Sequence, residues 1–432
     1  MTRPTTEDRR LTEGRRDRAV SVWIVTCVFP PEHAPAGHNA SELAEDLAHS
    51  GHNVTVLTGW PSHPEGTIYP GWTVRRGFRE MTKEGFTVVR CRHFLGRRFG
   101  LARKLWYYVT FAISSFFVGL RLSPRPDIIV IQSTPIFGAL SAILLAKLRR
   151  AKTFRWIHDV HPEGAINAGV LREGLVTRLI LALDTWNCRQ SDQVGTLTES
   201  MQGLLRRRGL PAEHVVIQRH WVDESRIFPS NRLNAWRERH GIPADAFVVL
   251  HAGTIGYISG AEVIIEAAKR LGDCGKILFL FVGEGPMKGR LEARVRDLGL
   301  QTVRFLPFQT DADLNLMQAT GDLGLVTLLA STGESSIPSK MHGYTAAGRP
   351  VIASVAEDSP TAVLVRENSV GWVVPPEDPE ALAAAIRRAD QDRDECLARG
   401  HRAREFFLRE FGRSAQTKQF EEYLLALCAK ER

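Results

Sequence analysis

The sequence predicts an α/β fold of two doubly wound domains in tandem, facing each other across a cleft. The chain has 432 residues, more than one ordinary domain uses. From Val20 onward, apolar β-branched runs alternate with helix-period segments, which is typical of parallel strands joined by crossover helices. A polar, proline-bearing stretch interrupts this pattern, which then begins again. We therefore expect a flexible basic tail at 1–19, domains at 20–225 and 246–405, a linker at 226–245, and a C-terminal helix at 406–432 that could return to the N-terminal domain.

Short β-branched runs and apolar residues at helical spacing define the individual elements. In the first domain the expected strands are 20–29, 53–58, 86–93, 127–132, 154–159, 193–198 and 214–218. The helices expected between them are 39–50, 103–121, 136–150, 173–190 and 199–208. In the second domain the strands are FVVLHAG, KILFLFVGEG, VRFLPF, LGLVTL, PVIASV and VGWVVP, with helices at 260–271, 286–299, 311–319, 339–347, 360–367 and 378–410. Ligands of such sheets bind beyond the carboxyl ends of the strands.

Composition and charge exclude several classes of protein. With 44% hydrophobic and 24% charged residues, the chain is globular rather than disordered or fibrous. Six scattered cysteines without a CxxC pair predict neither a disulfide framework nor a zinc site. The net charge of +8 favours polyanionic ligands or an anionic membrane surface. We expect no nucleic-acid binding, because no zinc-finger spacing, RNP-like aromatic strand or long basic helix accompanies the charge.

The N-terminal stretch and one apolar helix bear on location. The first residues are polar and arginine-rich, without the apolar core of a signal peptide, which favours the cytoplasm. The segment 105–121 is mostly apolar but shorter than the roughly 20 residues of a membrane span. Arginines flank it, and Trp106, Tyr107 and Tyr108 are residue types that favour the interface. We expect peripheral membrane contact through 97–125, with a buried crossover helix as the alternative.

Several common catalytic motifs are absent, and glycine turns take their place. The chain has no GxGxxG after its first strand, no GxxxxGK[ST], no HExxH and no GxSxG. In the second domain, turns rich in glycine follow two strands, at Gly253–Gly256 and Gly283–Gly285. Glycine lets the backbone approach a ligand, and the N–H groups of a following helix form an anion site. Lys340 is expected in a first helical turn, where a cation is unfavourable unless an anion is bound there, so its position points to a diphosphate.

These motifs resemble those of the GT-B glycosyltransferases of family GT4, retaining enzymes that use nucleotide sugars. The resemblance covers nearly the whole chain and is carried by Pro35-Ala-Gly37, the segment 51–58, Gly253-Thr254-Ile-Gly256, Val282-Gly-Glu-Gly-Pro286 and the block from Pro338-Ser-Lys340 to Gly348-Arg-Pro350. Three further segments, at 60–65, 159–163 and 220–223, resemble the branch that builds O-antigen, colanic acid and capsule repeats on a lipid carrier.

The resemblance implies roles for individual residues. It implies two Rossmann-like domains, with the nucleotide diphosphate sugar held mostly by the second. Phosphate contacts would come from Gly37, Gly253, Thr254, Gly256, Ser339 and Lys340. Gly283, Glu284 and Gly285, with Pro307 and Phe308, would lie near the base and ribose. His158 and Asp159 would face the transferred sugar and the acceptor.

Two positions depart from the family pattern of paired glutamates. Aligned through Gly348, these positions hold Ser335 and Gly343, and Glu334 can replace the first glutamate by a one-residue shift. The basic pair that many relatives carry after the glycine turn is replaced by Tyr257-Ile-Ser-Gly260. The candidate catalytic residues are therefore Asp159, His158, Lys340 and Glu334.

The resemblance implies a retaining glycosyltransferase that moves a hexosyl or N-acetylhexosaminyl group to a polyprenyl-diphosphate-linked saccharide at the inner face of the plasma membrane. A UDP-sugar is favoured over a GDP-sugar as the donor. Neither a metal nor another cofactor is expected, since no DxD flanked by apolar residues is present. Two alternatives stay open: a catalytically silent nucleotide-sugar-binding or scaffold subunit, and a GT-B epimerase of UDP-sugars.

Overall fold

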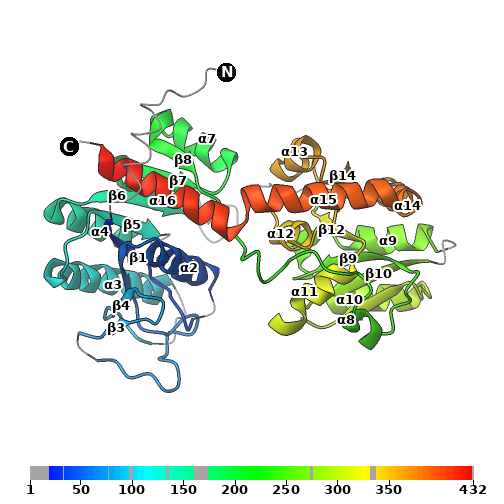
Figure 1. The fold of residues 1–432 in the computed structure, drawn as a ribbon, viewed down its shortest axis with the longest axis horizontal. Helices are drawn as coiled ribbons and strands as arrows, with labels where there is room; N and C mark the ends of the chain where they lie inside the picture. Colours follow the sequence, from blue (N-terminus) through cyan, green and yellow to red (C-terminus); the bar gives the residue numbers. More distant parts are fainter. Residues whose placement is uncertain are drawn as a thin grey trace. The chain divides into compact units, whose positions relative to one another are not determined.

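The computed structural model describes residues 19–32, 34–75, 77–96, 101–132, 136–159, 174–272, 276–330 and 337–430. It divides into two compact units, each with its own parallel sheet (Figure 1). The first unit comprises Met1–Gln218 and Thr417–Arg432, and the second comprises Arg219–Gln416. Each sheet, with its strands joined by crossover helices, is of the Rossmann type. Among the helices of the described ranges, none has both the length and the hydropathy of a membrane span.

The first unit contains an eight-stranded sheet. Its strands, in the order β3-β4-β2-β1-β5-β6-β7-β8, are parallel except for β3, which is antiparallel to β4. The strand bounds are β1 Ser21–Val25, β2 Asn53–Thr58, β3 Arg79–Met81, β4 Thr87–Arg90, β5 Ile128–Gln132, β6 Lys152–Ile157, β7 Gln193–Thr196 and β8 Val215–Ile217. The helix bounds are α2 Pro35–His49, α3 Leu101–Arg121, α4 Ile136–Arg149, α6 Leu175–Gln190 and α7 Glu199–Arg207, with the 3-10 turn η1 at Ala212–His214.

One face of this sheet is covered by α3 and α4. Trp23 and Val25 of β1 and Ile129 and Ile131 of β5 are almost fully buried in a cluster with residues of these two helices. Alternation along a strand sends these side chains to one face, so the apolar strand centres read from the sequence become the core. The last helix, α16 Arg413–Ala429, packs on the sheet through Phe420, whose ring lies 4.7 Å from that of Phe154.

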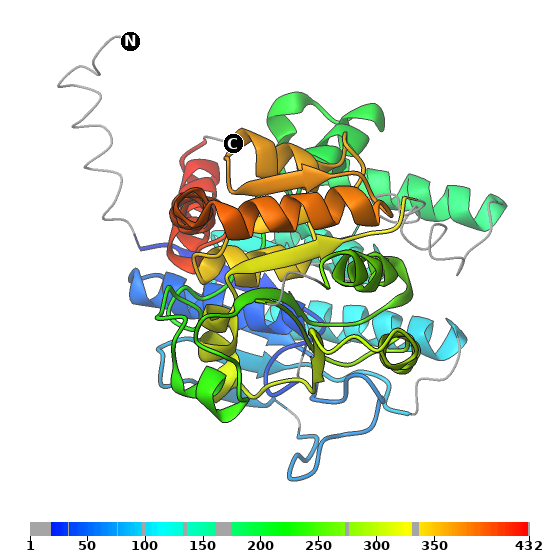
Figure 2. The ribbon, with the colours of Figure 1, turned by 90° about the vertical axis from the view of Figure 1, so that its right-hand side faces the viewer.

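The second unit has the strand order β11-β10-β9-β12-β13-β14, all parallel. The strand bounds are β9 Phe247–Ala252, β10 Ile277–Val282, β11 Val303–Leu306, β12 Leu323–Thr327, β13 Val351–Ser354 and β14 Gly371–Val374. The helices, which lie on both faces of the sheet in Figures 1 and 2, are α8 Ala235–Arg239, α9 Glu262–Arg270, α10 Lys288–Asp297, α11 Asp311–Thr320, α12 Ser339–Ala346, α13 Pro360–Glu367, α14 Pro379–Gln391 and α15 Arg393–Glu410. This order reverses between β9 and β12, the point where doubly wound sheets bind ligands.

The structure differs from the expected elements in three places. The helix expected at 378–410 is two helices, because Asp392 leaves helical geometry and its carboxylate accepts the N–H of Glu395 to begin α15. The residues of the expected linker pack on the second unit, where α8 buries Trp236 completely. Gly37 lies within the first turn of α2 rather than in a loop before a helix at 39–50.

Candidate functional site

The turns after β9 and β10 are joined to each other through their backbones. Gly253 donates its N–H to the carbonyl of Val282 at 2.8 Å, and Ile255 donates to Glu284 at 2.9 Å. The ladder of the two strands thus continues past their ends into the turns. The N–H of Met287, just before α10, also reaches the carbonyl of Ile255 at 3.1 Å.

Glycine is required where these turns touch. Gly253 and Gly283 have φ values of +115° and +154°, which side-chain-bearing residues rarely adopt. A Cβ on Gly283 would lie 2.0 Å from the carbonyl oxygen of Gly253, and one on Gly285 would lie 2.3 Å from that of Ile255. The edge of the sheet at this point is therefore a surface of backbone atoms, as an anion-binding turn needs.

Lys340 reaches this surface from the other side of the switch point. It is the second residue of α12, and its Nζ donates a hydrogen bond to the carbonyl of Thr254 at 3.1 Å. The aliphatic part of the Lys340 side chain packs against Gly253, because a Cβ added to Gly253 would lie 3.6 Å from Lys340 Cε. The N-cap of α12 is Pro338, whose side chain cannot accept a hydrogen bond from the first-turn amides. The N–H of Met341 is bonded to the carbonyl of Pro338 at 3.0 Å, so the first-turn amides left for a ligand are those of the exposed Ser339 and of Lys340, whose ammonium group lies beside the glycine turns.

The surroundings of Lys340 disfavour a positive charge. Burial lowers the pKa of Lys340, and the positive end of the α12 dipole disfavours its charge further. The fully buried His251, at the end of β9, is neutral, because burial and the nearby Lys340 charge lower its pKa to about 3. A bound anion would offset the charge of Lys340 and satisfy the helix terminus together.

Tight packing holds α12 in position over the sheet. The ring of Tyr344 covers Gly324 of β12, where a Cβ would lie 2.2 Å from the ring. The Tyr344 hydroxyl accepts the N–H of Ala252 at 2.8 Å, at the end of β9. Because Tyr344 is one turn beyond Lys340 on the same helix, this contact fixes the ammonium group relative to the glycine turns.

The remaining candidates of the second unit follow β9, β10 and β11 or lie in α12. Gly256 leads into the 3-10 turn η2 Tyr257–Ser259, and Glu284 forms an ion pair with Lys288 at 2.7 Å. Phe308, two residues after β11, is 56% exposed and available for stacking. Gly343 lies against the side chain of Gln318, where a Cβ would be 2.8 Å from Nε2. Glu334 and Ser335 lie outside the described residues.

The first unit holds the other predicted residues. Gly37 lies against the loop after β1, since a Cβ there would be 3.2 Å from the Cα of Phe29. His158 and Asp159 follow β6, and the His158 ring contacts that of Trp156 with centroids 4.4 Å apart. Asp159 is exposed, as an acceptor-binding carboxylate would be.

Sequence reasoning missed a buried charge network at this edge of the first sheet. Glu32 is 1% exposed, and its Oε1 accepts the N–H groups of Ser62 and His63, both at 2.7 Å. Its Oε2 accepts the N–H of Phe29 at 3.1 Å. The carboxylate therefore ties the loop after β1 to the loop after β2, and the only signal in the sequence was an acid placed after two prolines.

Arg90 supports the same loops from the end of β4. It donates to the carbonyls of Gly59 at 3.0 Å and Pro30 at 2.5 Å, and its guanidinium lies 5.1 Å from the ring centre of Trp72. Burial lowers the pKa of Arg90 to about 10, with Glu32 opposing the shift. Trp60, which belongs to the segment 60–65, is buried in this region and packs on Trp72 and Phe78. This tryptophan thus shapes the loops.

Within the described ranges, no three His, Cys, Asp or Glu side chains gather in a way that could hold a metal ion. The donor groups found at the sheet edge of the second unit are backbone amides and one ammonium group. Such a set suits an anion rather than a cation.

Known proteins resemble this chain over both units, and the solved structures among them share the GT-B fold of two Rossmann-like domains. Residues 36–220 match the family model described as "Glycosyl transferase 4-like domain", and residues 234–406 match "Glycosyl transferases group 1". WcaI of Escherichia coli (strain K12), which its name assigns to colanic acid biosynthesis as a glycosyl transferase, is 30% identical over 84% of this chain and 90% of its own length. Among solved structures, a sucrose-phosphate synthase from Thermosynechococcus elongatus aligns with a TM-score of 0.70 at 17% identity, covering 95% of this chain and 100% of its own. Anabaena HepE in complex with UDP aligns with a TM-score of 0.68 at 16% identity, covering 94% and 100%.

Proposed function

The chain belongs to the GT4, or group 1, family of GT-B glycosyltransferases, and from this premise we propose that it transfers a sugar from a nucleotide diphosphate sugar to a polyprenyl-diphosphate-linked saccharide in surface polysaccharide biosynthesis. The observation that carries the proposal is the contact between Lys340 and Thr254, which sets an ammonium group beside two glycine turns and a helix N-terminus. The name of the relative WcaI supports the pathway, and the UDP bound to HepE supports the class of donor.

In the proposed reaction the diphosphate lies at the N-terminus of α12. The bond between the anomeric carbon and the phosphate oxygen breaks while the acceptor oxygen forms its bond on the same face of the sugar. The leaving phosphate takes the acceptor proton, so the configuration is retained and no separate base is required. Lys340, Ser339 and the amides of the glycine turns stabilise the charge that develops on the leaving diphosphate, the main electrostatic demand of the step. No metal takes part in this proposal.

The first unit supplies the acceptor side in this scheme. Asp159 and His158, at the end of β6, orient the acceptor hydroxyl, and Gly37, in the first turn of α2, contacts a phosphate through its backbone. Glu334, which lies outside the described residues, remains a candidate for contact with the donor sugar. The location that follows is peripheral, on the cytoplasmic face of the membrane that carries the lipid-linked acceptor.

UDP is the donor nucleotide that we favour over GDP. The exposed ring of Phe308 lies at the end of β11, next to the strand whose turn contains Glu284, and offers a stacking face for the base. Glu284 and Gly285 then lie on the ribose side. Calorimetric titration with UDP and GDP measures this preference directly, and tighter binding of GDP would reverse it.

Replacing Lys340 with alanine tests the proposal. We expect nucleotide release from UDP-sugar in the presence of membrane lipid extract to fall about 100-fold or more, as when one transition-state donor is lost. The matched control is Lys276→Ala, because Lys276 is a 70% exposed lysine of the same unit that pairs with Asp245. Transfer that survives in Lys340→Ala at the wild-type rate would refute a diphosphate site here.

A silent donor-binding subunit is the second candidate function. It is favoured by Gly343, which lies against Gln318 and offers no carboxylate, and by Glu284, which is paired with Lys288. The two candidates differ in turnover. Donor binding without release of nucleotide, with every lipid extract tried, identifies the silent subunit, whereas an epimerase converts the UDP-sugar without any acceptor.

A further inference from the structure

Three neighbouring helices of the first unit carry an unusual amount of exposed apolar surface. Of 21 large hydrophobic side chains that are exposed in the described residues, ten belong to α3, α4 and α6. They are Leu105, Trp106, Ile113, Phe117, Phe137, Leu144, Leu148, Leu175, Leu179 and Trp186. These helices follow one another along the sheet, and their outward side is named here the three-helix face. Soluble proteins rarely gather so much apolar surface in one place without a partner for it.

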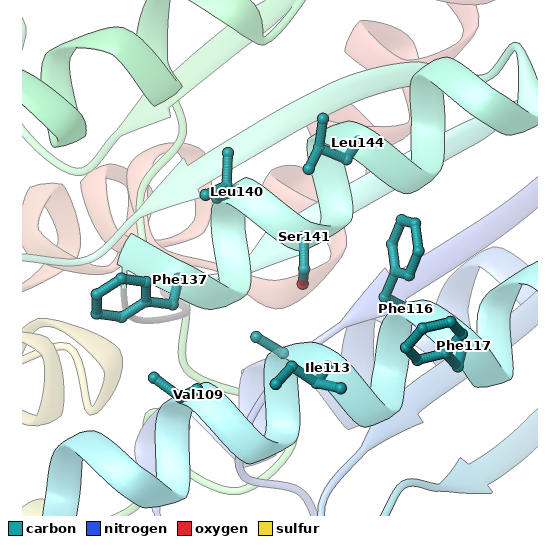
Figure 3. Close-up of a pocket in the computed structure, with 9 residues that line it drawn as sticks. Val109, Ile113, Phe116, Phe117, Phe137, Leu140, Ser141 and Leu144 are labelled. Atoms are coloured by element: carbon teal, nitrogen blue, oxygen red, sulfur yellow. The ribbon is translucent and has the colours of Figure 1, made fainter.

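A groove between α3 and α4 opens within this face (Figure 3). It encloses about 250 Å³, and its walls include Val109, Ile113 and Phe116 on α3 and Phe137, Leu140 and Leu144 on α4. Toward their C-terminal ends the helices close together, because Gly119 leaves a gap that the side chain of Leu145 fills. The groove therefore runs along α3 from Val109 to Phe117 and along α4 from Phe137 to Leu144, and it ends before this contact.

The groove offers nothing polar to a ligand. Ser141 is its only polar lining residue, and the Ser141 hydroxyl donates to the carbonyl of Gly138 within its own helix at 3.0 Å. The chemistry of the walls thus suits a hydrocarbon chain and excludes a sugar or a phosphate.

The charge on the three helices has a single sign at the surface. Helices α3 and α4 contain no Asp or Glu, and the one acid of α6, Asp184, is 2% exposed and bound to Arg155 at 2.6 Å. The same helices contain seven basic residues: Arg103, Lys104, Arg121, Lys147, Arg149, Arg178 and Arg189. Lys147 also lies 6.0 Å from the ring centre of Trp186. Exposed aromatic and aliphatic groups on helices whose surface charges are all basic match the interface of an anionic bilayer.

We propose that the three-helix face docks on an anionic lipid bilayer and that the groove between α3 and α4 receives one hydrocarbon chain of a membrane lipid. The binding goes beyond the proposed function, because it requires neither a donor nor sugar transfer. A second protein, including another copy of this chain, fits the surface less well, since the cations would need acids opposite them. Docking through α4 and α6 also enlarges the contact beyond the segment 97–125.

Vesicle sedimentation without any nucleotide sugar tests the docking. We expect the protein to pellet with vesicles of equal parts phosphatidylcholine and phosphatidylglycerol, and much less with phosphatidylcholine alone. The double variant Ile113→Ser and Phe117→Ser should lower this binding about tenfold. The matched control is Leu397→Ser, because Leu397 is 56% exposed on α15 of the other unit. Equal binding by the double variant and the control would overturn the proposal, as would a dimer that the double variant dissociates.

A photoreactive benzoylphenylalanine at position 116 tests the groove itself, because Phe116 points from α3 toward α4 in Figure 3. On illumination with anionic vesicles, we expect an adduct with the mass of one lipid. Ser141→Phe should fill the groove and reduce the adduct about fivefold while leaving sedimentation largely intact. The groove assignment would be overturned if Ser141→Phe left the yield of the lipid adduct unchanged. It would also be overturned if the photoreactive residue crosslinked to a second protein molecule instead of a lipid.

Thermal unfolding followed by circular dichroism is the folding control for every variant, and UDP binding reports on the donor site. The residues that we propose for donor binding lie mainly in the second unit, so the altered first-unit proteins should bind UDP as the wild type does. Loss of vesicle binding in a variant that unfolds at the wild-type temperature and still binds UDP concerns this inference alone. Intact vesicle binding in a protein that does not release nucleotide concerns the proposed function alone.

Discussion

The two units end their sheets in different ways. In the second unit the turns after β9 and β10 are shaped by glycines and by backbone hydrogen bonds, such as the 2.8 Å bond from Gly253 to Val282. In the first unit the loops after β1 and β2 are held by a buried carboxylate, Glu32, and by the guanidinium of Arg90. A surface made of backbone suits a ligand group that is always the same, such as a diphosphate. Loops held by side chains can change shape by substitution, which suits acceptors that differ between relatives.

The strongest test of the backbone-built edge is Gly283→Ala. A Cβ 2.0 Å from the carbonyl of Gly253 must push the two turns apart, and φ at this position is +154°. We expect a loss of about 3 kcal/mol or more in the free energy of unfolding of the second unit, and UDP binding too weak to measure. Urea unfolding and calorimetry give both values.

Gly289→Ala is the matched control for Gly283→Ala. Gly289 lies in α10, and no atom lies within 4 Å of an added Cβ. The change should be neutral or stabilise the helix by up to about 1 kcal/mol. A Gly283→Ala protein as stable as this control, with normal UDP affinity, would mean that backbone contact between the turns is unimportant.

Glu32→Gln tests the edge that is built from side chains. The amide has one oxygen in place of two, and its NH₂ group would face backbone donors, so we expect a loss of about 2–4 kcal/mol in the unfolding free energy of the first unit. The apparent KM for the acceptor should rise, while UDP binding stays unchanged. Glu65→Gln is the control, because Glu65 is exposed in the neighbouring loop. If Glu32→Gln and Glu65→Gln changed the unfolding free energy and the acceptor KM equally, the loops of the first unit would not depend on the buried carboxylate of Glu32.

Acid should weaken the second unit through His251. Its pKa in the folded protein is lowered to about 3, while the unfolded value is near 6.5. The contribution of His251 to the free energy of unfolding is therefore fully present above pH 6.5. It falls by about 2 kcal/mol between pH 7 and pH 5, because the unfolded chain gains a proton there and the folded protein does not.

His251→Phe removes this contribution in a ring of similar shape, next to Phe281. Urea unfolding at pH 7 and pH 5 gives the free energy of unfolding at each pH. The decrease between the two values should be about 2 kcal/mol smaller in His251→Phe than in the wild type. His220 and His342, which are partly buried and whose pKa values desolvation lowers to about 4, should keep part of the acid sensitivity. An identical pH dependence in His251→Phe and wild type would contradict a neutral buried His251.

The candidate site shows which parts of the fold could be predicted. The glycine turns and Lys340 were identified because glycine and a cation in a first helical turn are local signals. Phe308 and Glu284 were identified only through the resemblance to the family. Two of the contacts were not predictable, because the residues that Lys340 and Gly343 meet, Thr254 and Gln318, are far from them in the sequence. The pairing of Glu284 with Lys288 joins residues only four positions apart, and the sequence analysis did not consider it.

The sequence by itself determined the class of fold and the strand centres, because apolar periodicity is a local property that burial in a parallel sheet requires. It did not determine the break at Asp392, where one capping carboxylate ends a pattern that would otherwise continue. Only the tertiary structure showed that α4 and α6 extend the apolar surface of α3, and that Glu32 and Arg90 hold the loops of the first unit. Burial and pairing of such groups depend on which elements become neighbours, and that is decided when the sheet assembles.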